Sequence, residues 1–384
     1  MMCRGLSCLL AGALALACSS AQAEVKIGFA NPLSGAYALS GGRNRMAVEL
    51  AVERLNDAGG VLGEPLALVA VDDACGLQRA VEAAYELVTA GVVMVVGHMC
   101  SHSSLLAAGV YEAADVVMIS PSSTHPRLTE EGRRNIFRLN GRDDEQGRLA
   151  ADLLTRNWPG EAIAIVHDGS TYGQGLASQT RLHLRAVGVQ EALYQVYPAG
   201  APDHAELAAQ LKAAAIEVLY IGGYGPDAAR ILHAVRARGD DLQLVGGDGL
   251  GMDEFWTIAG RLGEGTLFSA RPVPAALPAV AEVLAEFRVS GLGSRSGGIA
   301  AYAAVEVWAQ AVERAASLEL PAVADMLRRG RFATVLGPVA FDGKGDLEGA
   351  SWQWHRWSAG GHLPLREPAP SAAASERAGT HLIR

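Results

Sequence analysis

The chain has 384 residues, half of them hydrophobic, and 45 glycines, which together predict a packed globular protein of two domains with many tight turns. The formal net charge is −9, and the sequence contains no block of lysine or arginine. This charge balance argues against nucleic acid or an anionic membrane surface as the main partner.

The N-terminus has the features of an export signal. Arg4 supplies a positive charge, an apolar run follows at residues 5–17, and residues 21–23 have the A-x-A form of a cleavage site. The apolar run is too short to span a membrane comfortably. Residues 1–23 are therefore predicted to be a signal peptide. The alternative is a lipid anchor at Cys18, although that cysteine lacks the leucine expected three residues before it.

From Glu24 the chain alternates short apolar runs with longer amphipathic segments. Strands are predicted over residues 25–30, 65–73, 92–98, 116–120, 162–168, 192–198, 217–223, 242–248 and 265–270. Helices are predicted over residues 45–59, 77–91, 104–115, 147–158, 205–215 and 227–239. Continuous apolar strands that alternate with helices are typical of parallel sheets covered on both faces, which predicts an α/β fold.

These strands are expected to form two sheets, one from the strands up to Ser120 and one from the strands between Ala162 and Asp248. The chain is expected to cross between the lobes around residues 137–142. Three helical patterns after Pro272 and two further strand-like segments would complete the first lobe and then cross back. The predicted division is residues 24–141 with 272–347, residues 142–271 with 348–363, and a tail at 364–384 with the composition of a disordered segment.

Removal of the signal leaves two cysteines, Cys75 and Cys100. Two cysteines in an oxidising compartment favour a disulfide, and closing a loop of about 25 residues would contribute roughly 3–4 kcal/mol. The alternative, a catalytic thiol at Cys100, requires Cys75 to stay unpaired as well.

In open parallel sheets, ligands bind beyond the carboxyl ends of the strands. Ser101 lies there at the start of a predicted helix, where free N–H groups favour an anion. Three further hydroxyl residues follow the next strand, namely Ser122, Ser123 and Thr124. Singly, such residues are most often helix caps or turn residues. Two such clusters at the ends of adjacent strands would face one crevice.

The same rule selects three residues in the second half of the chain. Asp248 follows a strand and lies among glycines, so that an ammonium partner and a local turn role are equally compatible with it. Tyr172 and Tyr224, taken singly, have the pattern of ordinary tyrosines. Hydroxyls, tyrosines, glycines and one carboxylate suit a small zwitterion better than they suit catalysis.

Several enzyme interpretations are weaker. His98 and His102 have no further ligand at a spacing that suits zinc, and the chain has no G-x-S-x-G elbow of an α/β-hydrolase. Residues 223–228 match a G-x-G-x-x-A dinucleotide fingerprint, but Pro226 removes a backbone donor near the expected pyrophosphate. Neither a metal nor another cofactor is expected.

Taken together, these segments make the sequence resemble a known family, the periplasmic binding proteins for leucine, isoleucine and valine of bacterial ABC importers. The resemblance runs from Val25 to about Trp357. It is carried by VKIGFANPLSGAYALSG, LNDAGGVLGEPL, VDDACG, VVGHMCSHSS, MISPSSTHPRLT, AIAIVHDGSTYGQGLA, YIGGYGPDAARIL, VGGDG and LGPVAFDGKGDL. It implies the type I fold, with two doubly wound parallel-sheet lobes joined by a multi-strand hinge.

The resemblance also implies roles for individual residues. A Cys75–Cys100 disulfide would hold two loops together. The ligand carboxylate would be bound by backbone N–H groups at Ser101 and Thr124. The ligand ammonium would be bound by the Ser122 carbonyl and Asp248, and the ligand would be covered by Tyr172 and Tyr224.

The sequence departs from the family at the pocket for the ligand side chain. Ser40 stands where an aromatic lid residue is usual, although Tyr37 is close enough in sequence to replace part of that ring. Gly297 aligns near a pocket phenylalanine, and Asp248 replaces the more common glutamate. Loss of two aromatic rings removes apolar contact area for the ligand, so an amino acid is expected without a specific side chain.

The expected function is that of a monomeric periplasmic receptor that closes on an amino acid and delivers it to a membrane permease driven by cytoplasmic ATPase subunits. Two alternatives remain open: a ligand-sensing protein for another small carboxylate or amide, and an exported enzyme on the same fold.

Overall fold

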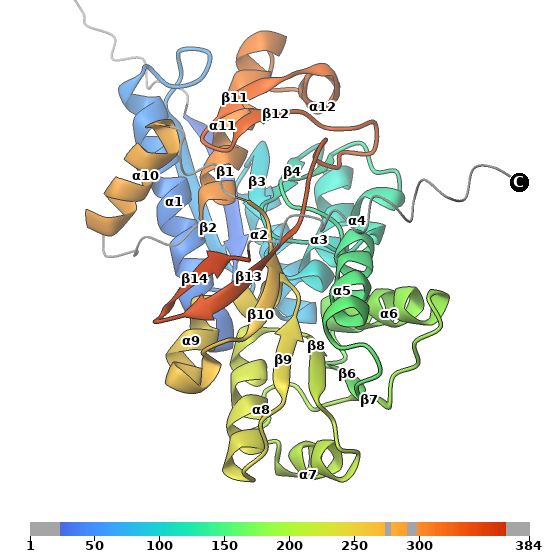
Figure 1. Cartoon of the computed structure of the whole chain (residues 1–384). Coiled ribbons are helices and arrows are strands. Elements are labelled where there is room, and N and C mark those ends of the chain that lie inside the picture. Colours follow the sequence, from blue (N-terminus) through green and yellow to red (C-terminus); the bar gives the residue numbers. More distant parts are fainter. Residues whose placement is uncertain (1–23, 273–277, 290–297, 366–384) are drawn as a thin grey trace, which may run out of the picture.

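The computed structural model describes residues 24–272, 278–289 and 298–365. The predicted signal peptide, Gly297 and the predicted tail from residue 366 lie outside these ranges. None of the helices in the described ranges is both long and apolar enough to cross a membrane. The chain forms two α/β lobes, as predicted (Figure 1).

The first sheet has five parallel strands in the order β2-β1-β3-β4-β5. Their bounds are β1 Val25–Asn31, β2 Leu66–Asp72, β3 Met94–Gly97, β4 Val117–Ser120 and β5 Ile136–Arg138. In β1, which lies between β2 and β3, Ile27 is paired with Leu68 on one side and Met94 on the other. The prediction that this sheet ends with Ser120 was wrong by one strand, because β5 pairs with β4 before the chain crosses over.

Two layers of helices cover the first sheet. Alternate side chains of a strand point to opposite faces, so Val96 joins the core under α1 and α11, while Val95 joins the core under α2 and α3. The helices of this lobe are α1 Ala38–Asp57, α2 Leu77–Thr89, α3 Ser101–Ala113, α4 Arg127–Glu130, α10 Pro278–Val289, α11 Ile299–Ala315 and α12 Leu320–Arg329, with the short η1 Gly35–Tyr37 before α1.

The second sheet has seven strands in the order β14-β13-β10-β9-β8-β6-β7. Their bounds are β6 Ile163–His167, β7 Leu193–Val196, β8 Val218–Gly222, β9 Gln243–Gly246, β10 Leu267–Ala270, β13 Gln353–Ser358 and β14 Gly361–Pro364. The strands β6 to β10 are parallel, but β13 and β14 add an antiparallel edge beside β10 (Figure 1). The prediction that the second sheet is wholly parallel was therefore wrong at this edge.

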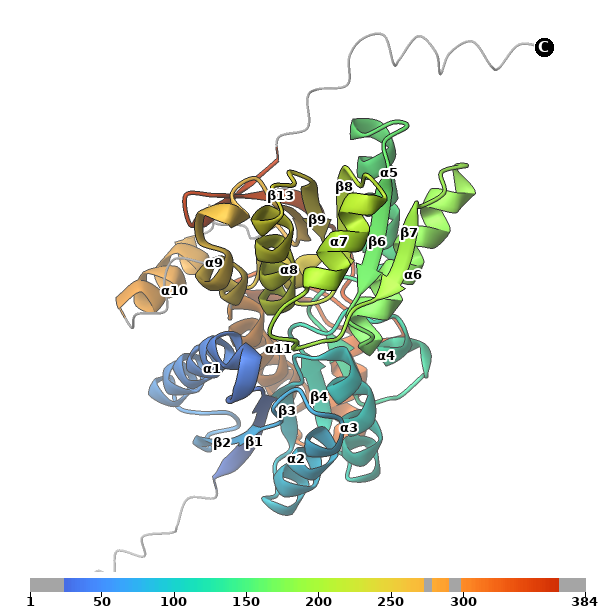
Figure 2. The same ribbon diagram turned by 90° about the horizontal axis from the view of Figure 1, so that it is seen from below.

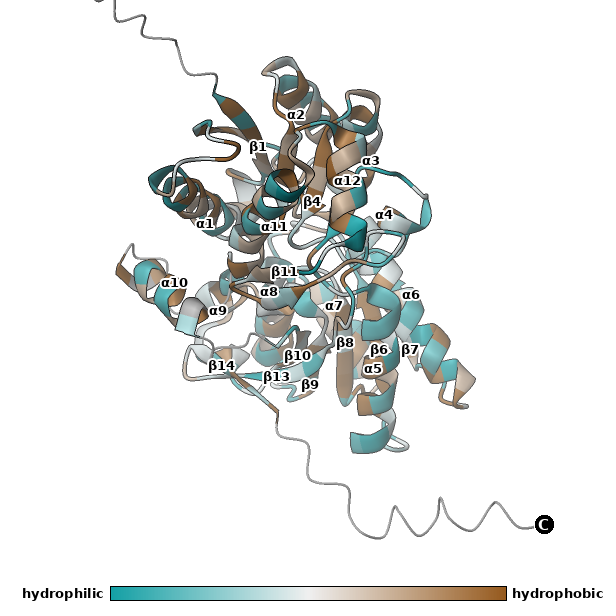
Figure 3. Ribbon diagram, turned by 90° about the horizontal axis from the view of Figure 1, so that it is seen from above, coloured by the Kyte–Doolittle hydropathy of each residue, from teal (hydrophilic) through white to brown (hydrophobic). Residues whose placement is uncertain are grey.

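The second sheet is also covered on both faces. On β8, Leu219 packs in the core with α7 to α9, while Tyr220 packs in the core with α5 and α6. The bounds of these helices are α5 Asp143–Asn157, α6 Thr171–Ala186, α7 Ala205–Ala213, α8 Gly225–Ala237 and α9 Asp253–Ala259, with the short η2 Asp248–Gly251 and η3 Gly260–Gly263. Figure 3 shows hydrophobic residues gathered in strands such as β4, while helices such as α6 alternate in hydropathy.

The chain passes between the lobes three times: after β5, after β10 and before β13. The hairpin of β11 Phe332–Thr334 and β12 Gly337–Val339 contributes Phe332 and Val339 to the core that also contains β1 and α11. Figure 2 shows β1 to β4 with α1 to α3 on one side and β6 to β9 with α5 to α9 on the other. The carboxyl ends of both sets of parallel strands meet at the boundary between the lobes.

Candidate ligand-binding site

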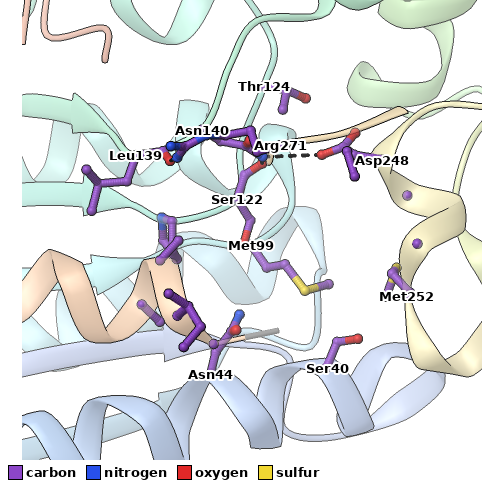
Figure 4. A pocket seen from close by; sticks show the side chains of 18 of the residues that line it. Ser40, Asn44, Met99, Ser122, Thr124, Leu139, Asn140, Asp248, Met252 and Arg271 are labelled. Atoms are coloured by element: carbon purple, nitrogen blue, oxygen red, sulfur yellow. Dashed lines mark hydrogen bonds between the residues drawn. The ribbon is translucent and has the colours of Figure 1, made fainter. Parts of the chain in front are cut away.

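A cavity of about 250 Å³ lies at this boundary and is lined from both lobes. This volume is slightly below the usual range of ligand pockets, about 300–1,000 Å³, and therefore suits a small molecule. Six of the residues selected from the sequence line it: Ser101, Ser122, Thr124, Tyr172, Tyr224 and Asp248. Figure 4 shows Asp248 and Met252 on one wall, with Ser40 and Asn44 of α1 along another.

Asp248 follows β9 and is held by three uncharged donors. Its Oδ1 accepts hydrogen bonds from Tyr172 Oη at 2.8 Å and from Gln146 Nε2 at 3.1 Å. Its Oδ2 accepts one from Asn140 Nδ2 at 3.2 Å (Figure 4). The carboxylate is thus fixed in orientation but has no cationic partner among these donors.

The carboxyl groups around Asp248 favour the binding of a cation. Burial raises the pKa of the Asp248 carboxyl, although the three hydrogen bonds act in the opposite direction. Burial, followed by the charge of Asp248, raises the pKa of Asp143 well above its usual value. The charge of Asp248 thus disfavours ionisation of Asp143, and a ligand ammonium group at Asp248 would relieve this repulsion.

A site that favours a negatively charged group lies at the start of α3. Ser101 is the first residue of this helix and lines the cavity. The side chain of the N-cap residue, Cys100, makes no capping hydrogen bond, so the N–H groups of the first turn remain available to another acceptor. Thr124 lies after β4 and also lines the cavity, while its carbonyl accepts the Asp143 N–H at 3.0 Å. A helix N-terminus beside a cavity favours a carboxylate.

The two neighbouring serines differ in their surroundings. Ser122 lines the cavity, and its carbonyl accepts a hydrogen bond from Asn140 Nδ2 at 3.0 Å. Ser123 is buried and is not one of the lining residues. Its hydroxyl lies 2.7 Å from Ser104 Oγ and donates to the His98 carbonyl at 3.2 Å. Ser123 therefore joins the loops after β3 and β4.

Three tyrosines form a row across the lobe boundary. The Tyr224 ring lies 4.8 Å from the Tyr37 ring of the first lobe and 5.0 Å from the Tyr172 ring, measured between centroids. Tyr172 and Tyr224 line the cavity, whereas Tyr37 packs on Tyr224 and does not line it. Burial raises the pKa of all three tyrosines above the usual value, so their hydroxyls stay protonated at neutral pH.

Ser40, which stands where an aromatic lid residue was expected, connects the two lobes instead. Its backbone N and its Oγ both donate to the carboxylate of Glu254 on α9, at 2.8 and 2.6 Å. One turn further along α1, Arg43 forms an ion pair with Asp253. Polar contacts between α1 and α9 thus hold the lobes together beside the cavity.

The region around Cys100 has structural roles. Cys75 and Cys100 form the expected disulfide, with their Cα atoms 5.7 Å apart. His98 is buried, with Nδ1 2.6 Å from Asp73 Oδ2 and Nε2 3.0 Å from Tyr111 Oη. The Nε2 atom of His102 lies 2.7 Å from the Cys75 carbonyl. Among the described residues, no group of three or more histidine, cysteine, aspartate or glutamate side chains is arranged to hold a metal ion.

The glycines of the dinucleotide-like segment are explained by packing. A Cβ at Gly225 would lie 2.9 Å from Phe255 Cβ, and a Cβ at Gly223 would lie 2.2 Å from Tyr197 Oη. Real Cβ atoms do not approach other atoms so closely, so both positions require glycine for close contact within the second lobe.

Sequence reasoning missed Asn140, Gln146 and Arg271. Asn140 follows β5 and Arg271 follows β10, so the rule of strand carboxyl ends applies to both. Asn140 is missed because the sequence pattern places β5 within the crossing between the lobes. Arg271 directly follows a strand that the sequence predicts, so the same rule identifies it. Gln146 lies inside α5, where no sequence signal marks its contact with Asp248.

Comparisons with known proteins agree with this geometry. A family model described as periplasmic binding protein matches residues 24–352. The chain is 36% identical over 342 residues to the Leu/Ile/Val-binding protein homolog 1 of Brucella melitensis, which covers 89% of this chain and 92% of that protein. It is 34% identical over 342 residues to the leucine-, isoleucine-, valine-, threonine- and alanine-binding protein of Pseudomonas aeruginosa, with 88% and 92% covered.

Among solved structures, the leucine-binding protein LivK of Thermotoga maritima is similar with a TM-score of 0.82 and 25% identity, over 90% of this chain and 99% of that one. Fold, cavity position and sequence similarity therefore lead to one conclusion: the chain belongs to the periplasmic binding protein family.

Proposed function

We propose that this protein is the substrate-binding protein of an ABC importer and captures a small amino acid, branched-chain or related, between its lobes. The observation that carries the proposal is that a carboxylate held by three uncharged donors and a helix N-terminus border the same cavity. This pair of sites complements a zwitterion. The names of the Brucella and Pseudomonas relatives support the same class of ligand.

In this proposal, the ligand ammonium binds Asp248 and the Ser122 carbonyl, and the ligand carboxylate binds N–H groups at Ser101 and Thr124. Charge-assisted hydrogen bonds of this kind fix orientation as well as affinity. Tyr172 orients Asp248 through its hydroxyl, and the ring of Tyr224 covers the ligand. Ser123 contributes by holding the loops that carry these groups.

Capture follows from closure of two bodies, which we assign to residues 24–141 with 272–347 and residues 142–271 with 348–363. A ligand that contacts both bodies only when they are closed shifts the population toward that state. The closed monomer, exported to the periplasm, then docks on the transmembrane subunits of a permease whose ATPase subunits lie in the cytoplasm. The ligand leaves chemically unchanged.

Isothermal titration calorimetry on protein unfolded and refolded to remove bound ligand tests this proposal. We expect at least one L-amino acid to bind, and leucine, isoleucine, valine, threonine and alanine are among those titrated. The matched controls are the N-acetyl derivative and the methyl ester of the best ligand, each of which removes one charge of the zwitterion. Equal binding of either control would refute the two-ended recognition. If the bound amino acid were recovered chemically modified, the protein would be an enzyme and the proposed role as a binding protein would be refuted.

A further inference from the structure

Arg271 is a cation in the cavity wall without a carboxylate partner. It follows β10 directly and lines the cavity. Its Nη1 donates to the Leu139 carbonyl, and its enclosed Nε has no hydrogen-bond partner. Within the described ranges, no aspartate or glutamate forms an ion pair with it. A guanidinium group has five N–H donors, and the Nε donor of Arg271 is enclosed without an acceptor among the described residues.

This situation differs from that of the other enclosed arginines near the site. Arg43, which lines the same cavity, forms an ion pair with Asp253. Arg138 is fully buried and forms an ion pair with Asp346 at 2.5 Å. An enclosed charge without a counter-ion is strongly unfavourable. Because the protein provides a carboxylate for these two, the missing one at Arg271 points to an anion from outside the chain.

Arg271 remains charged at neutral pH. Burial is the cause of the change in its pKa, and it lowers the pKa only to about 10. At the pH of the periplasm the guanidinium therefore still carries its proton, and an anion in the cavity would find a permanent positive charge in its wall.

Arg271 is bonded beside Asn140, whose amide donates to Asp248 and to the Ser122 carbonyl, so its guanidinium neighbours the proposed ammonium site without being part of it. Its hydrogen bond to Leu139 holds it beside the segment that carries Asn140, as Figure 4 shows. The ammonium site at Asp248 and the carboxylate site at the start of α3 use other atoms. Nearby cavity walls include apolar side chains such as Met99, Met252 and Ile299, none of which offers a charge.

We propose that Arg271 binds a second anionic group on the ligand, so that the preferred ligands are acidic amino acids with a side-chain carboxylate. The proposal rests on the proposed amino-acid function and narrows its ligand class. A neutral zwitterion leaves Arg271 uncompensated. An acidic amino acid provides a partner for Asp248, for the helix N-terminus and for Arg271 together.

The test compares ligands of equal size that differ only in side-chain charge. Calorimetry on the refolded protein should show glutamate binding at least about 10-fold more tightly than glutamine, or aspartate more tightly than asparagine, as a charge-assisted contact predicts. Arg271→Met should reduce this acid-to-amide affinity ratio by about 10-fold, toward equal affinities. Arg271→Lys, which keeps the charge, should restore part of the ratio.

Arg43→Met is the matched control, because Arg43 lines the same cavity but already has a carboxylate partner. It should change the affinities for acid and amide by the same factor. The ligand-free Arg271→Met protein should melt no lower than wild type, since it loses an uncompensated charge. A purely structural arginine would give a lower melting temperature.

Equal affinities of wild type for acid and amide would overturn the proposal and leave the amino-acid function intact, and so would an equal loss of both affinities in Arg271→Met. This comparison in wild type does not depend on how the variants fold. If no amino acid binds wild type at all, the proposed function itself fails.

Discussion

Replacement of Asp248 by asparagine removes the negative charge of the proposed ammonium site and the acceptor oxygen for Asn140 Nδ2. Asparagine has nearly the same size and retains a carbonyl oxygen that can accept the hydrogen bond from Tyr172 Oη. A hydrogen bond between a carboxylate and an ammonium contributes about 1.5–3 kcal/mol. Amino-acid affinity should therefore fall by about 10- to 150-fold in Asp248→Asn.

Fold stability should change in the other direction. Burial raises the pKa of Asp248. A carboxyl with a raised folded-state pKa contributes stability below its unfolded pKa, and this contribution is lost as the pH rises through the folded pKa. At pH 7 the ligand-free wild type thus contains an unfavourable ionised carboxylate that asparagine avoids. The variant should melt no lower than wild type at pH 7, and its advantage should shrink as the pH falls toward the ordinary carboxyl range.

Calorimetry at pH 7 measures the affinity, and thermal unfolding without ligand between about pH 4 and pH 7 follows the stability across the carboxyl range. Asp115→Asn is the control, because Asp115 makes an exposed ion pair with Arg134 and neither residue lines the cavity, and such pairs contribute about 0–1 kcal/mol. Affinity within twofold of wild type would refute the ammonium assignment. A ligand-free Asp248→Asn protein that melts several degrees lower would refute the electrostatic reasoning.

Two further predictions concern the supports of the site. Replacing Cys75 and Cys100 by serine should lower the free energy of unfolding by about 3.5 kcal/mol in a urea titration, and two free thiols in unreduced, unfolded wild type would contradict the disulfide. Glu254→Gln removes the charge that accepts two hydrogen bonds from Ser40, so ligand affinity should fall by about 3- to 10-fold. Exposed Glu49→Gln is its control, and equal effects of both changes would argue against an interlobe role.

The strands were predictable because most of them are buried on both faces. A strand in a covered parallel sheet is a continuous apolar run, and all nine predicted strands overlap strands β1 to β4 and β6 to β10. The exception, β5, has three residues and ends in Arg138, a charged residue that local patterning excludes from a core. Arg138 is accommodated there by Asp346, which is 208 residues away in sequence, and no local pattern records that pairing.

The site was predictable to the extent that strand ends define it. Ser101, Thr124 and Asp248 were selected because the carboxyl ends of parallel strands converge, and all three line the cavity. That rule places a residue at the crevice but does not set the direction of its side chain. The hydroxyl of Ser123 points to Ser104 because the two loops pack together, which is a tertiary property.

The enclosed charges of the cavity also bear on what closes the lobes. The contacts of Ser40 with Glu254 and of Arg43 with Asp253 join α1 to α9 and favour the closed state whichever ligand binds. Closure also removes water from Asp248, which disfavours the closed state until a cation is bound. The interlobe contacts and this desolvation cost oppose each other, and a ligand that removes the cost shifts the population toward the closed state. A ligand that neutralises more of the enclosed charge should therefore close the lobes more completely, and the degree of closure at saturation, measured by small-angle X-ray scattering, should follow the order of ligand affinities.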